Sequence, residues 1–311
     1  MTDQATDRDR QVARMLETMR ANWLPTAEGY LGERGAFEGL ARLFPEPIYA
    51  RHREETLGGV PVIATADLES GNNPERHILY LHGGAFVIGS PRIYREQSAR
   101  IARAAGAVVH SVDYRLAPEH PFPAALEDAT ASYLGLLERG IEGRQIVIAG
   151  DSAGANLALG AAGRLKRDGQ PLPAGLVLLS PWVDLSCAGQ TMSTNADARH
   201  LAQRQGLVTS ASHYLGERDP RDPEASPLYA DLSGLPEMLI QVGSKETLLD
   251  DARALDRRAR AAGGRTRLEI YGGMVHEWHL LAALMPPDEP LVDAQRAVES
   301  IGAFVRERTD D

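Results

Sequence analysis

The sequence predicts an α/β fold with a mostly parallel central sheet, helices on both faces and a helical cap. From about residue 78 onward, short runs rich in Val, Ile and Leu alternate with longer segments in which apolar residues recur every three or four positions. The short continuous runs are typical of strands buried on both faces. Their alternation with helices predicts a parallel sheet, and 311 residues are enough for one large core of this kind.

Composition excludes several classes of protein. The formal net charge of −10 argues against nucleic-acid binding, which requires a basic surface. Cys187 is the only cysteine, so no disulfide can form within the chain. The first ten residues are polar and charged, unlike a signal peptide, and no apolar stretch is long enough to cross a bilayer. We therefore expect a cytoplasmic protein that binds neither nucleic acid nor membrane.

The first third of the chain predicts one helix and one hairpin. Residues 7–23 carry an apolar stripe at helical spacing. Pro25 and the glycines at 29, 32 and 35 then interrupt the pattern. Two β-rich runs, 53–57 and 60–66, flank Gly58-Gly59 and predict a hairpin, which would add an antiparallel edge to the sheet.

The remaining elements follow in regular alternation. The predicted strands cover residues 78–81, 108–112, 146–149, 176–179, 238–242 and 268–271. The predicted helices lie near residues 93–105, 123–138, 154–167, 250–262 and 291–307. The last strand would lie at a sheet edge, where edge pairing could support a homodimer.

One segment interrupts the alternation. Residues 184–215 form a polar stretch with no strand, placed between two strands of the sheet. An insertion at the carboxyl end of a parallel sheet is well placed to cover an active site. We predict an N-terminal cap segment at 1–50 and a catalytic domain at 51–311 whose insertion near 184–215 completes the cap.

The stretch Gly150-Asp151-Ser152-Ala153-Gly154 carries the strongest chemical signal. It follows an apolar run and opens a helical pattern, and strand, tight turn and helix is the context of a nucleophile elbow. A turn this sharp brings two backbones close together, which requires glycines beside the serine. The sequence predicts Ser152 as a nucleophile at a helix N-terminus. Asp151 is predicted to stabilise the turn through a hydrogen bond or ion pair.

A second glycine-rich loop suits the oxyanion that such a nucleophile creates. His82-Gly83-Gly84-Ala85 directly follows the predicted strand 78–81. Backbone N–H groups without side chains in the way can approach an oxyanion closely. We predict donors at Gly83, Gly84 and Ala153, and a structural role for His82, with His82 as the base the weaker alternative.

The base and its orienting acid are sought late in the chain. His276 follows the last predicted strand and lies beside two glycines, and His279 is its competitor. Glu246 lies in the loop after the strand at 238–242, whereas Asp250 and Asp251 fit the first turn of the next helix. We predict the triad Ser152, Glu246 and His276, in the chain order expected for a nucleophile elbow.

These residues resemble the α/β-hydrolase superfamily and, within it, the bacterial hormone-sensitive-lipase-like esterases. The resemblance runs from about residue 75 to 305 and rests on the loop at 82–84, the block Asp113–His120, the elbow at 150–154, the Glu246 loop and His276. It implies an α/β-hydrolase fold, a carboxylic-ester hydrolase with an N-terminal cap, no cofactor and no metal, and it supports the triad above. The block at 113–120 is structural in such relatives.

Two positions depart from the pattern of these relatives. The third glycine of their oxyanion loop is Ala85 here, which implies a stiffer loop and a tighter acyl pocket. Their acid is often Asp, whereas Glu246 stands in this chain. A Glu is one methylene longer and can still accept a hydrogen bond from imidazole.

The leading hypothesis is a serine carboxylesterase that acts on short- to medium-chain esters through an acyl-enzyme on Ser152, with a small-molecule ester as its only required partner. A lactone hydrolase with the same triad is a close alternative. From a different class, a non-catalytic small-molecule receptor on a hydrolase scaffold is the competitor, because fold alone does not guarantee function. A peptidase ranks lower, since no substrate-recognition domain is visible, and a polar insertion argues against a lipase lid.

Overall fold

The computed structural model describes residues 2–25, 27–69, 75–197, 199–286 and 288–310, apart from the side chains of residues 2–6. Its strands are β1 (Ala50–Leu57), β2 (Val60–Asp67), β3 (His77–Leu81), β4 (Val108–Val112), β5 (Ile146–Asp151), β6 (Gly175–Leu179), β7 (Met238–Gly243) and β8 (Thr266–Tyr271). Its helices are α1 (Thr2–Asn22), α2 (Gly29–Leu40), α3 (Arg95–Ala105), α4 (Ala124–Glu138), α5 (Ala153–Arg167), α6 (Thr191–Thr194), α7 (Arg204–Leu215), α8 (Leu249–Ala261), α9 (Trp278–Leu281) and α10 (Val292–Thr309).

The strands form one sheet of eight in the order β1-β2-β4-β3-β5-β6-β7-β8. β1 pairs antiparallel with β2, and β2 pairs antiparallel with β4. Every pairing from β4 through β8 is parallel. The predicted parallel sheet with an antiparallel hairpin at one edge is therefore confirmed, and β8 lies at the other edge.

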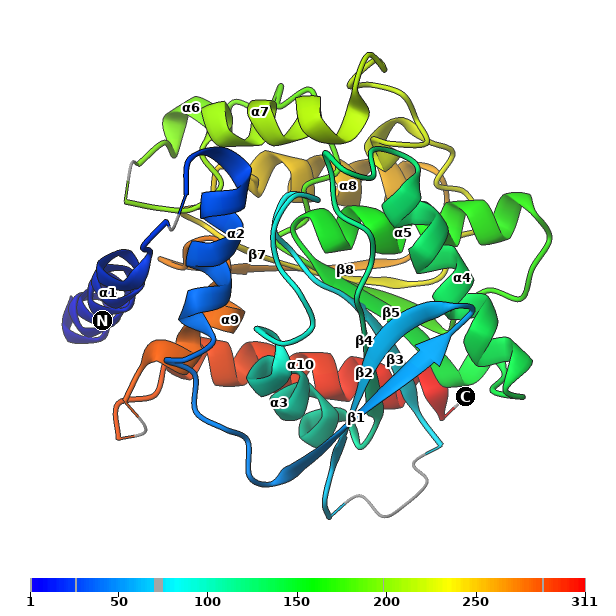
Figure 1. Cartoon of the computed structure of the whole chain (residues 1–311), viewed down its shortest axis with the longest axis horizontal. Helices are drawn as coiled ribbons and strands as arrows, with labels where there is room; N and C mark the ends of the chain where they lie inside the picture. Colours follow the sequence, from blue (N-terminus) through cyan, green and yellow to red (C-terminus); the bar gives the residue numbers. More distant parts are fainter. Residues whose placement is uncertain (1, 26, 70–74, 198, 287, 311) are drawn as a thin grey trace.

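Alternate residues of the central strands face two separate layers of helices. On β6, Leu176 and Leu178 join the apolar cluster under α4, α5 and α8, while Val177 and Leu179 join the cluster under α3 and α10. Figure 1 shows α4, α5 and α8 on one side of the sheet and α3 and α10 on the other. Because both faces are covered, all five residues of β6 are buried, as the continuous apolar runs predict.

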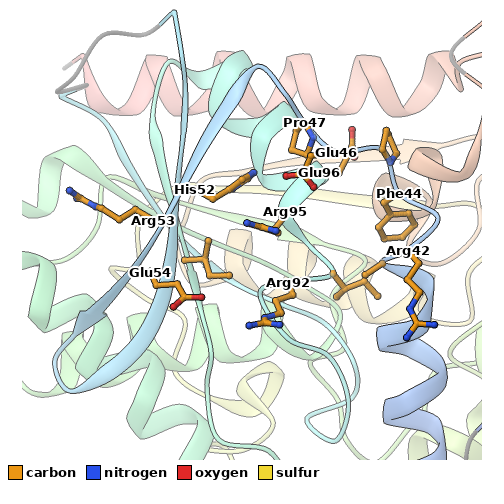
Figure 2. Close-up of a pocket in the computed structure, with 14 residues that line it drawn as sticks. Arg42, Phe44, Glu46, Pro47, His52, Arg53, Glu54, Arg92, Arg95 and Glu96 are labelled. Atoms are coloured by element: carbon orange, nitrogen blue, oxygen red, sulfur yellow. The ribbon is translucent and has the colours of Figure 1, made fainter.

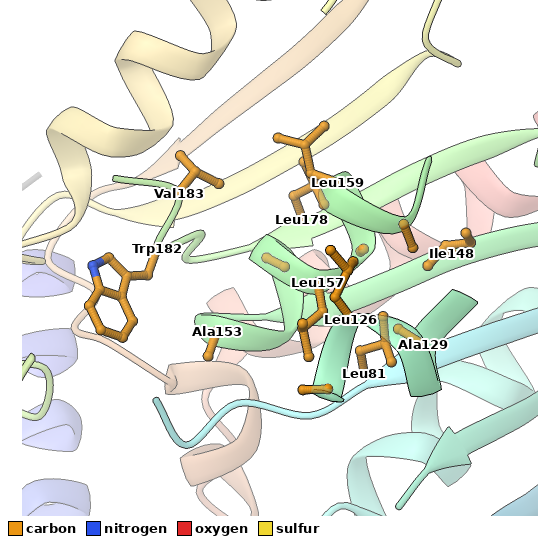
Figure 3. Close-up of a cluster of buried hydrophobic side chains, with 14 of the residues drawn as sticks. Leu81, Leu126, Ala129, Ile148, Ala153, Leu157, Leu159, Leu178, Trp182 and Val183 are labelled. Atoms are coloured by element: carbon orange, nitrogen blue, oxygen red, sulfur yellow. The ribbon is translucent and has the colours of Figure 1, made fainter. Parts of the chain in front are cut away.

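The layer beneath α5 holds the elbow in place. Figure 3 shows Leu157 and Leu159 of α5 packed among Leu81, Ile148 and Leu178 from three adjacent strands. These side chains are buried almost completely. Close packing of this kind fixes where the helix begins relative to the ends of the strands, and the helix begins directly after Ser152.

One prediction for the N-terminal region is wrong. The glycines at 29, 32 and 35 indicated a break, yet α2 spans Gly29–Leu40. Phe37 and Leu40 are buried on the body of the protein, and this tertiary packing outweighs the low helix propensity of glycine. Gly32 also permits a close approach, since a Cβ there would lie 1.8 Å from the carbonyl oxygen of Ala27.

The described residues of the insertion at 184–215, which leave out 198, form α6 and α7 and no strand, as predicted. Its hydrogen bonds tie it to the loop after β7: Asn195 Nδ2 donates to the carbonyl oxygens of Ser244 and Glu246, at 3.1 and 2.9 Å. Arg34 of α2 donates to the carbonyl oxygen of Val87, in the loop after β3. Both segments thus lie over the carboxyl ends of the parallel strands, where Figure 1 shows α2, α6 and α7.

The part of the chain that the structure describes contains no helix long and apolar enough to cross a membrane.

Truncation of a central strand residue tests this packing. Ile240 of β7 is fully buried between the two helix layers, whereas Ile48 is 85% exposed. Ile240→Ala should lower the free energy of unfolding by roughly 2–5 kcal/mol, because transfer free energy is lost and a cavity remains. The matched change Ile48→Ala should stay within about 0.5 kcal/mol of wild type. Urea denaturation of both variants measures this, and equal effects would contradict the proposed core.

Candidate active site

Ser152 stands at the junction of β5 and α5 with an unusual backbone. Its φ of 52° and ψ of −116° are strained for a residue other than glycine. The Ser152 N–H donates to the carbonyl oxygen of Leu179 on β6 at 2.8 Å, and the Trp182 N–H donates to the Ser152 carbonyl oxygen at 3.2 Å. These bonds hold the strained turn, and they place the hydroxyl at the carboxyl edge of the sheet.

The two glycines of the elbow are required by close backbone contacts. A Cβ on Gly154 would lie 1.9 Å from the carbonyl oxygen of Leu81 on β3, and a Cβ on Gly150 would lie 2.4 Å from backbone atoms of Gly154. No side chain fits at such distances. The elbow therefore sits directly against the strand that leads into the loop at 82–85.

His276 and Glu246 lie beside Ser152. The Nε2 atom of His276 is 3.1 Å from Ser152 Oγ, and its Nδ1 atom is 2.8 Å from Glu246 Oε2. The other carboxyl oxygen, Oε1, accepts hydrogen bonds from Ser180 Oγ at 2.8 Å and from the Gly243 N–H at 2.5 Å. All three predicted triad side chains are buried. The structure thus brings together a hydroxyl, an imidazole and a carboxylate in the order that nucleophilic catalysis requires.

The competing histidines take other roles. His82 Nδ1 contacts the carbonyl oxygen of Gly83 at 2.7 Å, and its ring stacks on Tyr114 with 4.2 Å between centroids. Burial lowers the pKa of His82 to about 4, so the ring is neutral at pH 7. His279 Nε2 lies 3.0 Å from Gln241 Oε1, away from the elbow. Both rings are buried and contact structural groups rather than Ser152.

The competing aspartates lie on α8 and hold the insertion. Asp250 Oδ2 accepts the N–H of Thr191 at 3.1 Å. Asp251 Oδ2 accepts the N–H groups of Val183 and Asp184, each at 3.0 Å. Neither carboxyl is bonded to His276. Of the three acids that the sequence offered, only Glu246 contacts the imidazole.

The predicted oxyanion donors are placed differently from one another. The Gly83 N–H donates to the hydroxyl of Tyr94 at 3.1 Å, and Gly83 does not line the cavity that contains Ser152, whereas Gly84 and Ala85 do. Gly83 faces the interior, since a Cβ there would lie 2.2 Å from Asp151 Oδ2. The Gly83 N–H therefore has a partner that competes with an oxyanion, whereas no such partner is found for the predicted donors Gly84 and Ala153 among the described residues.

The cavity at Ser152 has a volume of about 470 Å³. Its floor contains Ser152 and His276, together with Gly84 of the oxyanion loop. The opposite walls come from two distant segments. Their apolar side chains are Trp23, Tyr30 and Phe37 from the N-terminal region and Leu201 and Leu207 from the insertion, beside polar residues such as Glu33 and Gln203. A small apolar ligand would be enclosed between these walls and the hydroxyl.

A larger cavity, of about 610 Å³, lies elsewhere. Figure 2 shows it between the segment at 44–47, His52 of β1 and the start of α3, with Arg92 and Arg95 on its wall. Among the residues that line it are four arginines and three glutamates, but no pair of nucleophile and base. Size alone thus points to the wrong place, and the chemistry of the lining residues identifies the smaller cavity as the candidate active site.

Several residues of the site carried no recognisable sequence signal. Ser180 supports Glu246, and Tyr80 and Tyr94 donate to Asp151 at 2.7 and 2.8 Å. A serine after one strand and tyrosines near another have no diagnostic spacing, so only the fold reveals them. Asp151 does stabilise the turn through hydrogen bonds, as the sequence predicts. Among the described residues, no three His, Cys, Asp or Glu side chains are grouped so as to hold a metal ion.

The sequence of this chain is similar to those of known proteins with the alpha/beta hydrolase fold. A family model described as the alpha/beta hydrolase fold matches residues 78–280. An acetyl-hydrolase of Streptomyces hygroscopicus is 46% identical over 236 residues, which are 76% of this chain and 77% of that protein.

Solved structures agree over almost the whole chain. The crystal structure of an esterase from the bacterial hormone-sensitive lipase family superposes with a TM-score of 0.90 at 39% identity, covering 96% of this chain and 98% of that one. A crystal structure of EstE5 soaked with p-nitrophenyl butyrate superposes with a TM-score of 0.88 at 35% identity, covering 97% and 99%.

The carboxyl of Asp251 predicts a pH dependence of stability. Burial raises its pKa to about 8, although two backbone N–H groups stabilise the charged form. The folded state therefore keeps a proton that the unfolded chain, with a carboxyl pKa near 3.8, has released. The free energy of unfolding accordingly falls as the pH rises from about 4 to about 8.

Asp251→Asn removes this titration while the amide oxygen can still accept both N–H groups. Urea denaturation between about pH 5 and about pH 8 should show a smaller fall in stability for this variant than for wild type. Asp250→Asn is the control, since that carboxyl remains partly exposed. Equal slopes for Asp251→Asn and wild type would contradict a protonated Asp251.

Proposed function

This chain belongs to the α/β-hydrolase fold family as an esterase of the bacterial hormone-sensitive lipase type, and we propose that it hydrolyses short- to medium-chain carboxylic esters through an acyl-enzyme on Ser152. One observation carries the proposal: His276 lies 3.1 Å from Ser152 Oγ on one side and 2.8 Å from Glu246 on the other. Both are within the distance that proton transfer and orientation require.

Acylation begins when Ser152 Oγ attacks the ester carbonyl carbon and His276 Nε2 takes the hydroxyl proton. The carbonyl oxygen becomes an oxyanion, for which the N–H groups of Gly84 and Ala153 are the proposed donors, with that of Gly83 available once it leaves the Tyr94 hydroxyl. Ala153 begins α5, so the positive end of that helix also favours the developing charge. The intermediate then collapses, the C–O bond to the alcohol breaks, and His276 gives its proton to the leaving oxygen.

Deacylation repeats these steps with water. His276 Nε2 takes a proton from the water as its oxygen attacks the acyl carbon, and the second intermediate expels Ser152 Oγ, which recovers the proton. Glu246 accepts a hydrogen bond from the Nδ1–H group throughout and stabilises the imidazolium that forms in each half-reaction. The bonds from Ser180 and Gly243 hold the Glu246 carboxyl in one orientation.

The acyl chain is proposed to lie under a cap formed by residues 1–50 and the insertion at 184–215, with residues 51–311 as the catalytic domain. Both cap segments contribute walls to the 470 Å³ cavity. An acyl group there is bound mainly by apolar contacts, and the volume of the cavity limits its length. An acetyl-hydrolase among the relatives, and an EstE5 crystal that was soaked with p-nitrophenyl butyrate, both accord with short acyl groups.

Two alternatives differ in their experimental signature. A lactone hydrolase would use the same triad, but its leaving alcohol stays attached to the acyl chain. A small-molecule receptor on this scaffold would bind esters without turnover. The bonded triad favours catalysis over the receptor, because receptors have no use for a serine that a histidine activates.

Replacement of the nucleophile tests the proposal directly. Ser152→Ala should reduce turnover of p-nitrophenyl acetate and butyrate by at least about 10³-fold, since no acyl-enzyme can form. Ser210→Ala makes the same change in the same cavity, away from His276, and should leave kcat/KM nearly unchanged. Steady-state kinetics measures both variants. Near-normal turnover by Ser152→Ala would overturn the mechanism, and a folded wild type inactive on esters but active on lactones would select the alternative.

The length of the acyl pocket is tested with p-nitrophenyl esters from acetate to palmitate. We expect kcat/KM to be highest for the short esters and to fall steeply for the long ones. Leu207 is buried on α7 at the cavity wall, while its neighbour Val208 is exposed. Leu207→Ala should raise the octanoate-to-acetate ratio of kcat/KM by about threefold or more. Val208→Ala should leave that ratio at the wild-type value, and an unchanged ratio in Leu207→Ala would contradict this placement of the acyl chain.

A further inference from the structure

Two carboxyl groups that the proposed mechanism does not use, those of Asp151 and Glu277, lie under the oxyanion loop. Asp151 is 1% exposed and Glu277 is 6% exposed. Asp151 directly precedes Ser152, and Glu277 directly follows His276. Their side chains are hydrogen-bonded to each other. The two residues that perform proton transfer are therefore each flanked by a member of one buried acid pair.

The pair is connected to the oxyanion loop through Tyr94. Asp151 Oδ2 accepts a hydrogen bond from the Tyr94 hydroxyl at 2.8 Å, and that hydroxyl accepts the N–H of Gly83 at 3.1 Å. A Cβ on Gly83 would lie 2.2 Å from Asp151 Oδ2, 2.8 Å from Glu277 Oε1 and 3.0 Å from the Tyr94 hydroxyl. The two acids and the phenol thus pack against the backbone of the loop from below.

The hydrogen bonds around the two acids require one of the two carboxyl groups to be protonated. Asp151 accepts from the hydroxyls of Tyr80 and Tyr94, and each hydroxyl has only one proton to give. Gln97 in turn donates to Tyr80 at 2.8 Å, so the phenol proton is committed to Asp151. Two ionised carboxylates have no hydrogen to share, and their contact inside the protein would be strongly repulsive.

Among the described groups that face Glu277, the one base is His276, whose Nε2 already contacts Ser152 Oγ. The charged groups that face Glu277 are Asp151, Glu246 and His276, from the ends of β5, β7 and β8. The phenols of Tyr80, Tyr94 and Tyr114 face it from β3, the segment before α3 and the segment after β4. Burial raises the pKa of both acids, and the charge on Asp151 raises that of Glu277 further. The side chain that holds the proton is therefore Glu277.

We propose that Asp151 and Glu277 share one proton, and that this singly charged pair is a positioning group which holds the oxyanion loop against the elbow through Tyr94. The inference rests on the proposed function, because it assigns a role beside the nucleophile and the base. Glu277 also lines the cavity at Ser152, but its role in the pair is not to bind substrate. The pair acts through Tyr94 on the backbone that presents the donors.

The proton on Glu277 also prevents this carboxyl from competing with Ser152 for His276 Nε2. Glu277 Oε1 lies 3.5 Å from His276 Nε2, the atom that must take the proton of Ser152. A neutral Glu277 leaves this atom to the serine. An ionised Glu277 would compete for a proton on Nε2, and it would add a second negative charge near the oxyanion that forms at the elbow. Loss of the shared proton at alkaline pH should therefore lower kcat/KM.

Infrared difference spectroscopy of the full chain tests the protonation state without any turnover. The C=O stretch of a protonated carboxylic acid is distinct from that of a carboxylate. Wild type minus Glu277→Gln at about pH 7 should show one protonated-acid band, and the buried Asp251 cancels because both proteins contain it. Absence of this band overturns the proposal even if the esterase mechanism holds. Its presence stands even if Ser152 is not the nucleophile.

Kinetics of the same variant tests the positioning role. Glu277→Gln keeps a neutral hydrogen-bond donor, so kcat/KM at about pH 7 should stay within about threefold of wild type, while the alkaline decline moves to higher pH or disappears. Glu277→Ala removes the donor and should lower kcat/KM by roughly tenfold. Superimposable alkaline profiles of wild type and Glu277→Gln, or full activity in Glu277→Ala, would overturn the role.

Tyr94→Phe cuts the link between the acid pair and the loop. We expect kcat to fall by roughly tenfold with little change in KM, because oxyanion stabilisation is made only in the transition state. Tyr133→Phe is the matched control: that hydroxyl is also inside the protein and donates to the carbonyl oxygen of Pro171, far from the elbow. An unchanged kcat in Tyr94→Phe, or an equal loss in the control, would contradict the proposal.

Discussion

The backbone at Ser152 has a strained φ of 52°. The geometry of the candidate active site depends on the backbone contacts that hold this turn. There is no room for a side chain at Gly150 or Gly154, since an added Cβ at either position would collide with backbone atoms. The elbow packs against β3 and is hydrogen-bonded to β6. These contacts fix the position of the serine hydroxyl relative to the loop after β3. A site built on rigid strands in this way can hold donors and nucleophile in register without a bound ligand.

Buried carboxyl groups surround the elbow in two contrasting environments. Glu246 accepts bonds from Ser180, Gly243 and His276, so three donors stabilise its negative charge. Asp151 and Glu277 have two phenol donors between them and must keep a proton to coexist. The two environments differ in donor number. Glu246 accepts from three donors, whereas Asp151 and Glu277 share two phenol donors and are left with a single charge.

Two distant segments complete the cavity over this rigid base. Asn195 ties the insertion to the Glu246 loop, and Arg34 ties α2 to the oxyanion loop and to Glu119. The block at 113–120 therefore has a structural role, as expected, with Glu119 as an anchor for α2. Each wall of the cavity at Ser152 is hydrogen-bonded to one part of the candidate site, so the shape of the cavity and the geometry of the site are coupled through short contacts.

The order of strands and helices, the hairpin at the edge, the elbow and the candidates for each catalytic role could all be predicted from the sequence, because each leaves a local pattern. Continuous apolar runs specify strands buried on both faces, and glycines beside Ser152 specify a tight turn. A pattern of this kind describes only neighbours along the chain. It predicted a break where α2 forms, since the burial of Phe37 and Leu40 is a tertiary effect.

Only the tertiary structure decided which candidates meet. It brought Glu246 rather than Asp250 or Asp251 to His276, and it turned Gly83 toward Tyr94 instead of the cavity. It also joined Asp151 to Glu277 across 126 positions of the chain. Such pairings depend on how parallel strands converge at one edge of the sheet, and the residues they unite have no spacing in common. Distance in space, set by the packing of the sheet between its helix layers, selects among residues that the sequence presents as equals.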